Sequence, residues 1–310
     1  MKLKTIAEYC GLTIFGNKSL DIRTISYAKE AEKDDLAVAF SLNDIHETKA
    51  AAVLTEPRTC ITEKTLVYCL YGDIISAISK VADLLIKEGC CLNYNSMPLY
   101  TERSPGVYFG KEVVIDEGTM ISPFTTIGDY VKVGKNCYIE SNVFIGSGTI
   151  IGDNCFIHSG AKIGTGSFLH YEESGIAKCF LGIGKVILKN GVQIGCNSII
   201  QRGTLTDTVI GDRTIIGNLV IIGHDVKISN DTRVVCQSGI AGGATIGAHT
   251  LIMGQSGIVN NVHIGDCVTI LSKSRATKNV RDGKVISGSY GNNHKEEMKS
   301  KALLHKLGRR

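Results

Sequence analysis

One histidine in this sequence is placed where an imidazole could act as a base. His224 follows Gly223 and precedes Asp225, with polar Asn218 one six-residue repeat earlier. At a chain corner its side chain can project outward. Because imidazole titrates near neutral pH, it could there take a proton from an attacking amine or hydroxyl. The alternative is an inert surface histidine at a turn. We take His224 as the candidate general base, with Asp225 beside it.

Other kinds of chemistry lack the residues that they need. Eight histidines are present, but those of the repeat region fall at different corner positions, without the spacing of a zinc site between subunits. No nucleophile elbow, phosphate-binding loop or dinucleotide fingerprint stands at a strand–helix junction. The sequence therefore predicts no metal site and no covalent intermediate, and it favours direct attack assisted by a base.

An aliphatic residue at every sixth position organises most of the chain. Period six fits neither an amphipathic helix nor one long strand, and it is typical of a hexapeptide solenoid built from short strands and corners. The residue after the aliphatic is often glycine. We therefore expect a narrow prism with the aliphatic side chains inside. The repeat comprises Ile115, Ile121, Ile127, Val133, Ile139, Ile145, Ile151, Ile157, Ile163, Leu188, Ile194, Ile200, Ile210, Ile216, Ile222, Ile228, Val234, Ile240, Ile246, Ile252, Ile258, Ile264 and Ile270.

The repeat is interrupted twice, over residues 168–185 and residues 203–208. Interruptions of a strict repeat must bulge outward as loops, and loops on a solenoid commonly shape a binding cleft. The longer one carries His170 and Tyr171. We expect it to contribute to such a cleft, and the alternative for both interruptions is a tolerated insertion.

The two ends of the chain lack the repeat. We expect a small α/β domain over residues 1–104, the repeat domain over 105–288 and a short basic helical tail over 289–310. The tail either caps the last coil or docks an acidic partner. Within the first region, apolar spacing predicts helices over Thr5–Cys10 and Ile74–Lys87, and strands over Leu36–Phe40 and Ala51–Leu54.

Composition narrows the class of protein. The chain has 310 residues, 35 glycines, no tryptophan and 6% aromatic residues, which suits a thin solenoid with a core of stacked aliphatics. A net charge of +4 does not indicate nucleic acid. The 11 cysteines form no CxxC pair, and Cys137 and Cys155 are expected in the core one coil apart. With no apolar leader and no apolar stretch of membrane-spanning length, the sequence predicts a cytoplasmic protein.

Four segments of the repeat region carry a family resemblance. They are Ile222-Gly-His-Asp-Val-Lys-Ile, Gly239-Ile-Ala-Gly-Gly-Ala-Thr-Ile-Gly, Gly254-Gln-Ser-Gly-Ile and Ile264-Gly-Asp-Cys-Val-Thr-Ile. Together they resemble the UDP-3-O-acylglucosamine N-acyltransferases of lipid A synthesis. The resemblance extends to nearly the whole chain, because Lys4-Thr-Ile-Ala-Glu-Tyr-Cys-Gly and Asp34-Asp-Leu-Ala-Val-Ala-Phe look like that family's N-terminal uridine-binding domain.

The resemblance implies a mainly β fold, a left-handed parallel β-helix, assembled as a homotrimer with active sites between subunits. Handedness comes from the resemblance alone, since the general rule for parallel crossovers gives a right-handed coil. The implied reaction moves a hydroxyacyl chain from the phosphopantetheine thioester of acyl carrier protein to the 2-amino group of a UDP-3-O-acylglucosamine, with no further cofactor. His224 falls on the family's catalytic base and Asp225 on the residue after it. The oxyanion would need a backbone N–H from a corner glycine.

The resemblance also indicates which residues would bind the two substrates. The amino-sugar side would be bound by Asn261, Gln201, His170 and Tyr171 together with Phe40. Val38 stands at the family's place for the uracil-stacking aromatic, and Phe40 lies two residues later on the same strand face. The acyl-donor side would be bound by Lys295, Lys299 and Arg309 of the tail, which resembles the segment that engages acyl carrier protein.

Several positions depart from the family's pattern. Asn261 stands where a second histidine is common, and His263 lies two positions on. Gln201-Arg202-Gly203 replaces Asp-Arg-Gly, and the turn after the solenoid lacks its proline. Two alternatives therefore stay open. One is an acetyl-CoA-dependent N-acetyltransferase of another nucleotide-linked amino sugar in surface polysaccharide synthesis, and the other is a non-catalytic solenoid scaffold.

Overall fold

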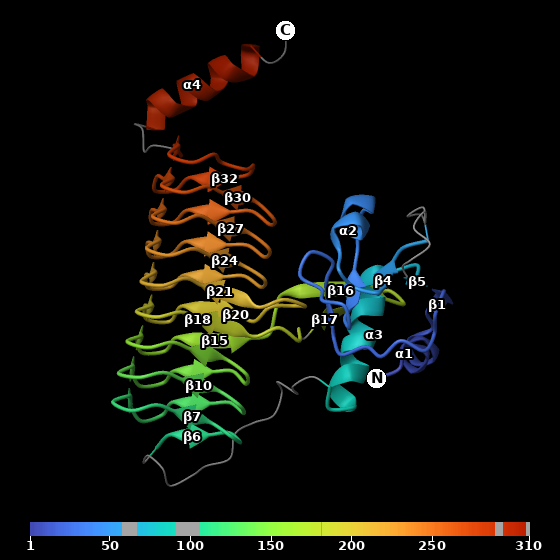
Figure 1. Cartoon of the computed structure of the whole chain (residues 1–310). Coiled ribbons are helices and arrows are strands. Elements are labelled where there is room, and N and C mark those ends of the chain that lie inside the picture. The colour runs from blue at the N-terminus through green and yellow to red at the C-terminus, as the bar shows by residue number, and fades with distance from the viewer. Residues whose placement is uncertain (58–66, 91–105, 181, 289–293, 308–310) are drawn as a thin grey trace.

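The computed structural model describes residues 1–57, 67–90, 106–180, 182–288 and 294–307. They form a tall solenoid of three parallel sheets, an α/β unit beside its middle, and a separate helix, α4 (His294–Leu307), beyond the last coil (Figure 1). The domain boundaries expected after residues 104 and 288 adjoin stretches outside the described residues. Within the described ranges, no helix has the length and apolarity needed to cross a bilayer.

The N-terminal α/β unit is a five-stranded sheet in the order β1-β5-β4-β3-β2, parallel except between β1 and β5. Gly11 ends the first helix in the left-handed conformation, with φ at 73°. Asp73 caps the N–H groups of Ile75 and Ser76 at the start of the last one. The predicted helices and strands are therefore confirmed, with ends shifted by at most two residues. The elements are α1 Leu3–Cys10, β1 Thr13–Phe15, β2 Ile25–Tyr27, β3 Leu36–Val38, α2 Leu42–Glu47, β4 Ala52–Thr55, β5 Val67–Leu70 and α3 Ile74–Lys87.

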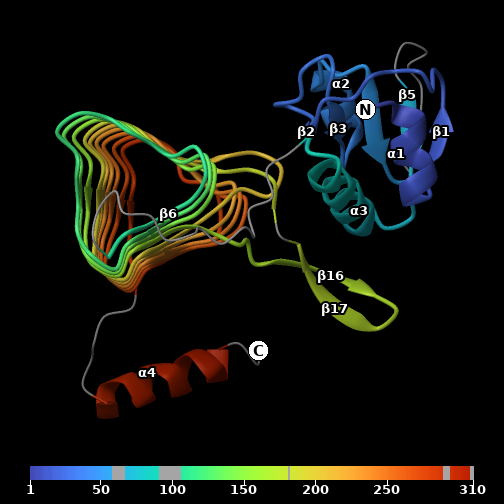
Figure 2. The ribbon, with the colours of Figure 1, turned by 90° about the horizontal axis from the view of Figure 1, so that it is seen from below.

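The solenoid confirms the left-handed parallel β-helix, and its coils are triangular when viewed along the axis (Figure 2). Strands pair in parallel with the coils above and below, and paired residues such as Lys132 and Ile150 are three repeats apart. From Ile127 to Ile270 the aliphatic repeat positions are at most 3% exposed. Stacked aliphatic burial therefore holds the coils together.

The three sheets of the solenoid contain the following strands. The first contains β7 Val114–Ile115, β10 Lys132–Val133, β13 Ile150–Ile151, β18 Val186–Leu188, β21 Thr208–Ile210, β24 Lys227–Ile228, β27 Thr245–Ile246 and β30 His263–Ile264. The second contains β8 Met120–Ile121, β11 Tyr138–Ile139, β14 Phe156–Ile157, β19 Gln193–Ile194, β22 Ile215–Ile216, β25 Arg233–Val234, β28 Leu251–Ile252, β31 Thr269–Ile270 and β33 Val285–Ile286. The third contains β6 Tyr108–Phe109, β9 Thr126–Ile127, β12 Phe144–Ile145, β15 Lys162–Thr165, β20 Ile199–Gln201, β23 Ile221–Ile222, β26 Gly239–Ile240, β29 Gly257–Ile258 and β32 Arg275–Ala276.

Corners of the solenoid use left-handed backbone at a six-residue interval. Asp225 has φ at 59° and Asn261 at 58°, a region that Asn, Asp and Gly tolerate best. Cys137 and Cys155 lie buried one coil apart, with the Cys155 N–H donating to Cys137 Sγ at 3.4 Å, as predicted. The corner at Asp225 fixes the direction of the neighbouring His224 side chain.

Both interruptions of the repeat leave the prism on the side of the α/β unit. The longer one is a hairpin of β16 (Leu169–Glu173) and β17 (Ile176–Phe180), which reaches α3 (Figures 1 and 2). The shorter one is a loop that carries Leu205. Phe180, Ile183 and Leu205 are buried in the same hydrophobic cluster as the core of the α/β unit. These two interruptions therefore attach the unit to the solenoid.

Candidate active site

A cleft of about 810 Å³ lies between the solenoid and the α/β unit. The α/β unit contributes Tyr27 and Phe40, the hairpin contributes Phe168, and the corners of the solenoid contribute His224 and Gly242. Three segments far apart in sequence thus meet at one hollow. The cleft combines apolar rings with a small polar group, as ligand sites commonly do.

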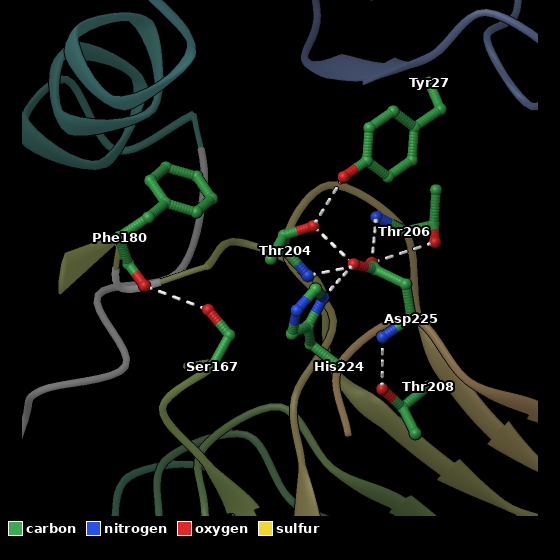
Figure 3. Close-up of polar contacts among 8 residues, drawn as sticks. All are labelled: Tyr27, Ser167, Phe180, Thr204, Thr206, Thr208, His224 and Asp225. Carbon is green, nitrogen blue, oxygen red and sulfur yellow. Dashed lines mark hydrogen bonds and ion pairs between the residues drawn. The ribbon is translucent and has the colours of Figure 1, made fainter. Parts of the chain in front are cut away.

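His224 and Asp225 form a hydrogen-bonded pair on the solenoid wall of the cleft (Figure 3). His224 Nδ1 lies 2.7 Å from Asp225 Oδ2, and the two side chains are 14% and 6% exposed. Because a carboxylate only accepts hydrogen bonds, Nδ1 must donate. The free lone pair of the neutral ring is therefore on Nε2.

Asp225 is held by the loop of the second interruption. Its Oδ1 accepts from the backbone N–H of Thr204 at 2.8 Å and of Thr206 at 3.3 Å, and from Thr206 Oγ1 at 3.1 Å. Its Oδ2 accepts from Thr204 Oγ1 at 2.5 Å. The Asp225 N–H in turn donates to Thr208 Oγ1 at 3.0 Å. With His224 included, five donors fix the orientation of this carboxylate, and the carboxylate fixes the ring.

Gly242 makes room for the imidazole one coil above. A Cβ on Gly242 would lie 2.4 Å from His224 Nε2 and 2.5 Å from Cε1. At the same corner four coils lower, the backbone N–H of Asp129 donates to Ser147 Oγ on the next coil. Gly242 has no side chain to offer His224 such an acceptor, and its own N–H has no hydrogen-bond partner within the described part of the chain. The backbone N–H groups of both His224 and Gly242 are therefore without hydrogen-bond partners among the described residues.

Five of the residues that the sequence proposed for the site line the cleft. They are Phe40, His170, His224, Asp225 and Asn261. The ring of His170 packs 5.7 Å from that of Phe168, centroid to centroid. The resemblance and the hairpin position thus selected residues that the fold brings together.

The other candidate residues lie elsewhere. Gln201 is half-buried in β20 beside Thr165, and it does not line the cleft. Tyr171 accepts a hydrogen bond from Ser79 of α3 at 3.3 Å, because alternate residues of the hairpin face opposite sides. Lys295 and Lys299 are exposed on α4, away from the cleft, and Arg309 lies outside the described residues.

Sequence reasoning did not identify Tyr27, Thr204, Thr206 or Lys227. The two threonines reach Asp225 only because the interruption folds back over the corner. Lys227 forms an ion pair with Glu30 of the α/β unit across the cleft, and burial lowers the pKa of this lysine. The Thr-Leu-Thr pattern at the break in the repeat was the available signal for the threonines.

One further side-chain group lies outside the cleft, on another corner. Glu140, His158 and Cys196 bring their potential ligand atoms within 4.8 Å of one another. Histidine spacing along the sequence does not reveal this group, because only one of its three members is a histidine. Glu140 already accepts from the Ser159 N–H and Oγ, and these bonds lower the pKa of its carboxyl. His158 Nδ1 lies 3.5 Å from the same carboxylate, which accounts for the arrangement as a polar pair.

Sequence comparisons find bacterial transferases similar to parts of this chain. Residues 130–165 match the model of the bacterial transferase hexapeptide (six repeats). The UDP-3-O-acylglucosamine N-acyltransferase of Rickettsia massiliae is 36% identical over 75 residues, 24% of this chain and 22% of that protein. The enzyme of the same name from Albidiferax ferrireducens is 39% identical over 67 residues, 22% of this chain and 20% of that protein. The chain thus spans about a fifth of the length of these relatives, and the predicted resemblance is confirmed over that part.

Solved structures share the fold. The UDP-N-acetylglucosamine acyltransferase of Bacteroides fragilis is 26% identical with a TM-score of 0.51, covering 57% of this chain and 68% of that chain. The UDP-N-acetylglucosamine O-acyltransferase of Moraxella catarrhalis is 24% identical with a TM-score of 0.52, covering 64% of this chain and 77% of that chain. The hexapeptide solenoid is thus a fold found in sugar-nucleotide acyltransferases.

Proposed function

We propose that this hexapeptide-repeat protein, similar to the UDP-3-O-acylglucosamine N-acyltransferases, transfers an acyl group from a thioester to the amine of a UDP-linked amino sugar. The observation that carries the proposal is the His224–Asp225 pair, in which Asp225 holds Nδ1 of a histidine that lines a cleft shared with the α/β unit. The proposed acceptor is a UDP-3-O-acylglucosamine and the proposed donor is acyl carrier protein. Both assignments follow the names and family properties of the relatives.

His224 supplies the base for this reaction. As the 2-amino nitrogen attacks the thioester carbonyl, Nε2 takes its proton and a C–N bond forms. The C–S bond then breaks, and the leaving thiolate takes the proton from the imidazolium. The products are an amide and a free thiol, and His224 returns to its neutral form.

The corner beside His224 supplies a candidate for oxyanion stabilisation. Negative charge collects on the carbonyl oxygen in the tetrahedral intermediate and needs a fixed hydrogen-bond donor. The Gly242 N–H is without a partner in the described structure, and the glycine itself packs against the imidazole. We assign it this role, because no side chain at Gly242 limits the approach of the substrate.

The wall formed by the α/β unit supplies a candidate site for the nucleotide. Phe40 is 54% exposed and lies in the cleft, where its ring is available to stack on uracil. The ring of Tyr27 lies beside it, with the centroids 6.3 Å apart. Lys227 lines the same cleft, paired with Glu30, and offers a cation for the diphosphate.

The test uses the purified full-length chain with 3-hydroxyacyl-acyl carrier protein and UDP-3-O-acylglucosamine, with mass spectrometry of the product. We expect an amide product with the wild type, and a rate lower by about 100- to 10,000-fold in His224→Gln. His249→Gln is the matched control, since His249 is an exposed corner histidine outside the cleft. Transfer from acetyl-CoA alone would establish the N-acetyltransferase alternative instead. Failure with both donors in a folded protein would support the scaffold alternative.

A homotrimer is the proposed assembly. Ile215, Leu219 and Ile221 are large apolar side chains exposed on the coil that leads to His224, and exposed apolar clusters commonly mark protein interfaces. Sedimentation should give three times the chain mass of 33.3 kDa. Ile221→Asp should dissociate the assembly, whereas Ile176→Asp, at a more exposed site on the hairpin, should not. A monomeric wild type would contradict the proposal.

A further inference from the structure

A chain of hydrogen bonds connects the α/β unit to the imidazole of His224. Tyr27 Oη lies 2.9 Å from Thr204 Oγ1, Thr204 Oγ1 lies 2.5 Å from Asp225 Oδ2, and Asp225 Oδ2 lies 2.7 Å from His224 Nδ1 (Figure 3). Tyr27 and Thr204 are 177 residues apart in sequence. The two parts of the protein therefore meet at a polar contact as well as at an apolar one.

The direction of every bond in this chain is fixed by the carboxylate. The Asp225 carboxylate can only accept hydrogen bonds. Thr204 Oγ1 therefore donates its single hydroxyl proton to Asp225, and His224 donates from Nδ1. Thr204 Oγ1 must then accept from Tyr27, whose phenol is the donor. Burial, assisted by the nearby Asp225, raises the pKa of Tyr27 to about 12. The phenol therefore keeps the proton that it donates.

The loop between Tyr27 and Asp225 is anchored on both sides. Thr204 and Thr206 bind Asp225, while Leu205 between them lies in the hydrophobic cluster of the α/β unit. At the base of the hairpin, Ser167 Oγ donates to the Phe180 carbonyl at 2.9 Å, and Phe180 joins the same cluster (Figure 3). Docking of the unit thus fixes the loop that orients the base.

We propose that Tyr27 of the α/β unit is a positioning residue for His224, acting through Thr204 and Asp225. This inference rests on the proposed function, and it gives the α/β unit a second role beyond binding the nucleotide. Tyr27 polarises Thr204, which strengthens the bond to Asp225 and limits how strongly that carboxylate draws the proton of the imidazole. The unit therefore helps to keep the ring in place and neutral, with Nε2 free.

The kinetic test compares Tyr27→Phe, Thr204→Val and the double variant. We expect kcat to fall by about 3- to 10-fold in Tyr27→Phe with little change in KM, because one neutral hydrogen bond is removed. The acid limb of the pH–rate profile should move up by about 0.4 to 1 unit, since Asp225 then attracts the imidazolium more strongly. The other titratable groups lining the cleft, Lys29, Glu30, Asp44, His170 and Lys227, are the same in both proteins. In the Thr204→Val background, Tyr27→Phe should have no further effect, because the chain is already broken.

Two control variants separate positioning from folding. Thr204→Ser keeps the hydroxyl and should retain the wild-type pH profile. Tyr71→Phe removes a phenol of the same unit that accepts from Lys80 at 2.8 Å and lies outside the cleft, so it should leave kcat unchanged. A fall in kcat with an unmoved profile, or additive losses in the double variant, would overturn the proposal.

A measurement without acyl donor makes the inference testable apart from the proposed function. In selectively ¹⁵N-histidine-labelled protein, assigned with His224→Gln, the wild-type imidazole should show protonated Nδ1 and unprotonated Nε2. Tyr27→Phe should raise the fraction of imidazolium at the same pH. If this change occurs in a protein that transfers no acyl group, the proposed function fails and the positioning role stands. Identical spectra would overturn the role of Tyr27 whatever the activity.

Discussion

Gly242 and His224 lie on adjacent coils with no space for a side chain between them, since a Cβ on Gly242 would lie 2.4 Å from His224 Nε2. The atom that we propose as the proton acceptor is thus the one that packs against the glycine. The backbone conformation at Gly242 does not call for a glycine, because its φ lies outside the left-handed region. A glycine is needed there because the His224 ring leaves no room for a Cβ.

Gly242→Ala should displace the imidazole and leave the coil folded. A shift of about 1 Å at a reacting group can cost about 100-fold in rate, so we expect kcat to fall by at least that factor. Gly239→Ala is the matched control, because a Cβ there meets nothing within 4 Å. Steady-state rates and thermal unfolding of both variants check the prediction. Equal activity of the two would mean that the ring position is unimportant.

Asp225→Asn should reverse the tautomer of His224. The backbone N–H groups of Thr204 and Thr206 hold the Oδ1 position for an oxygen, so the new amide nitrogen would face His224 Nδ1 and donate to it. The proton would then reside on Nε2, and kcat should fall by about 100- to 10,000-fold with a modest change in the melting temperature. Rates measured beside thermal unfolding distinguish this loss from unfolding. An active variant with a wild-type pH profile would show that the tautomer is not controlled by this residue.

Phe40→Ala should weaken binding of the nucleotide sugar more than it slows the chemical step. Stacking of a base on an aromatic ring contributes about 1–3 kcal/mol, so KM for the UDP-sugar should rise by about 5- to 150-fold with a smaller change in kcat. Phe15→Ala is the control, since Phe15 is 53% exposed against 54% for Phe40 but lies outside the cleft. Calorimetric titration with UDP gives an independent reading. Equal effects of the two substitutions would remove Phe40 from the site.

Alkaline conditions should destabilise the wild type more steeply than Tyr27→Phe. The pKa of Tyr27 rises from 10.0 to about 12 on folding. Between these values the unfolded phenol loses its proton while the folded one keeps it, so the free energy of unfolding falls as pH rises through this window. Below pH 10 the contribution of Tyr27 is fully present. Urea unfolding of both proteins below and within the window measures the slopes, and parallel curves would show that Tyr27 is not buried as described.

The six-residue repeat could be predicted from the sequence because every aliphatic position does the same thing, which is to bury one side chain in the core of its coil. Ile127 and Ile145 bury the same kind of side chain at the same place in successive coils, so periodicity alone predicts the prism. The position of His224 at a corner follows from the same count. The handedness does not, because two mirror-related windings present the same pattern of buried residues, and here the family resemblance supplied it.

The partners of Asp225 could not be read from the sequence. Thr204 lies 21 residues before Asp225 in the sequence, and it belongs to the loop that leaves and rejoins the prism. Tyr27 belongs to a different part of the fold, the α/β unit. Contacts of this kind depend on how the interruption folds, and the repeat carries no information on that. Tyr171 illustrates the same limit, because one residue's difference along the hairpin decides whether a side chain faces α3 or the cleft.

The placement of Phe180, Ile183 and Leu205 in the core of the α/β unit has a consequence for the order of folding. The ribosome makes that unit before the solenoid, yet part of its apolar interior is encoded 93 to 118 residues after the end of its last helix at Lys87. Domains usually fold in the order of their synthesis. Here the α/β unit leaves the ribosome with part of its apolar core still exposed. That core is filled only after the middle of the solenoid has been synthesised.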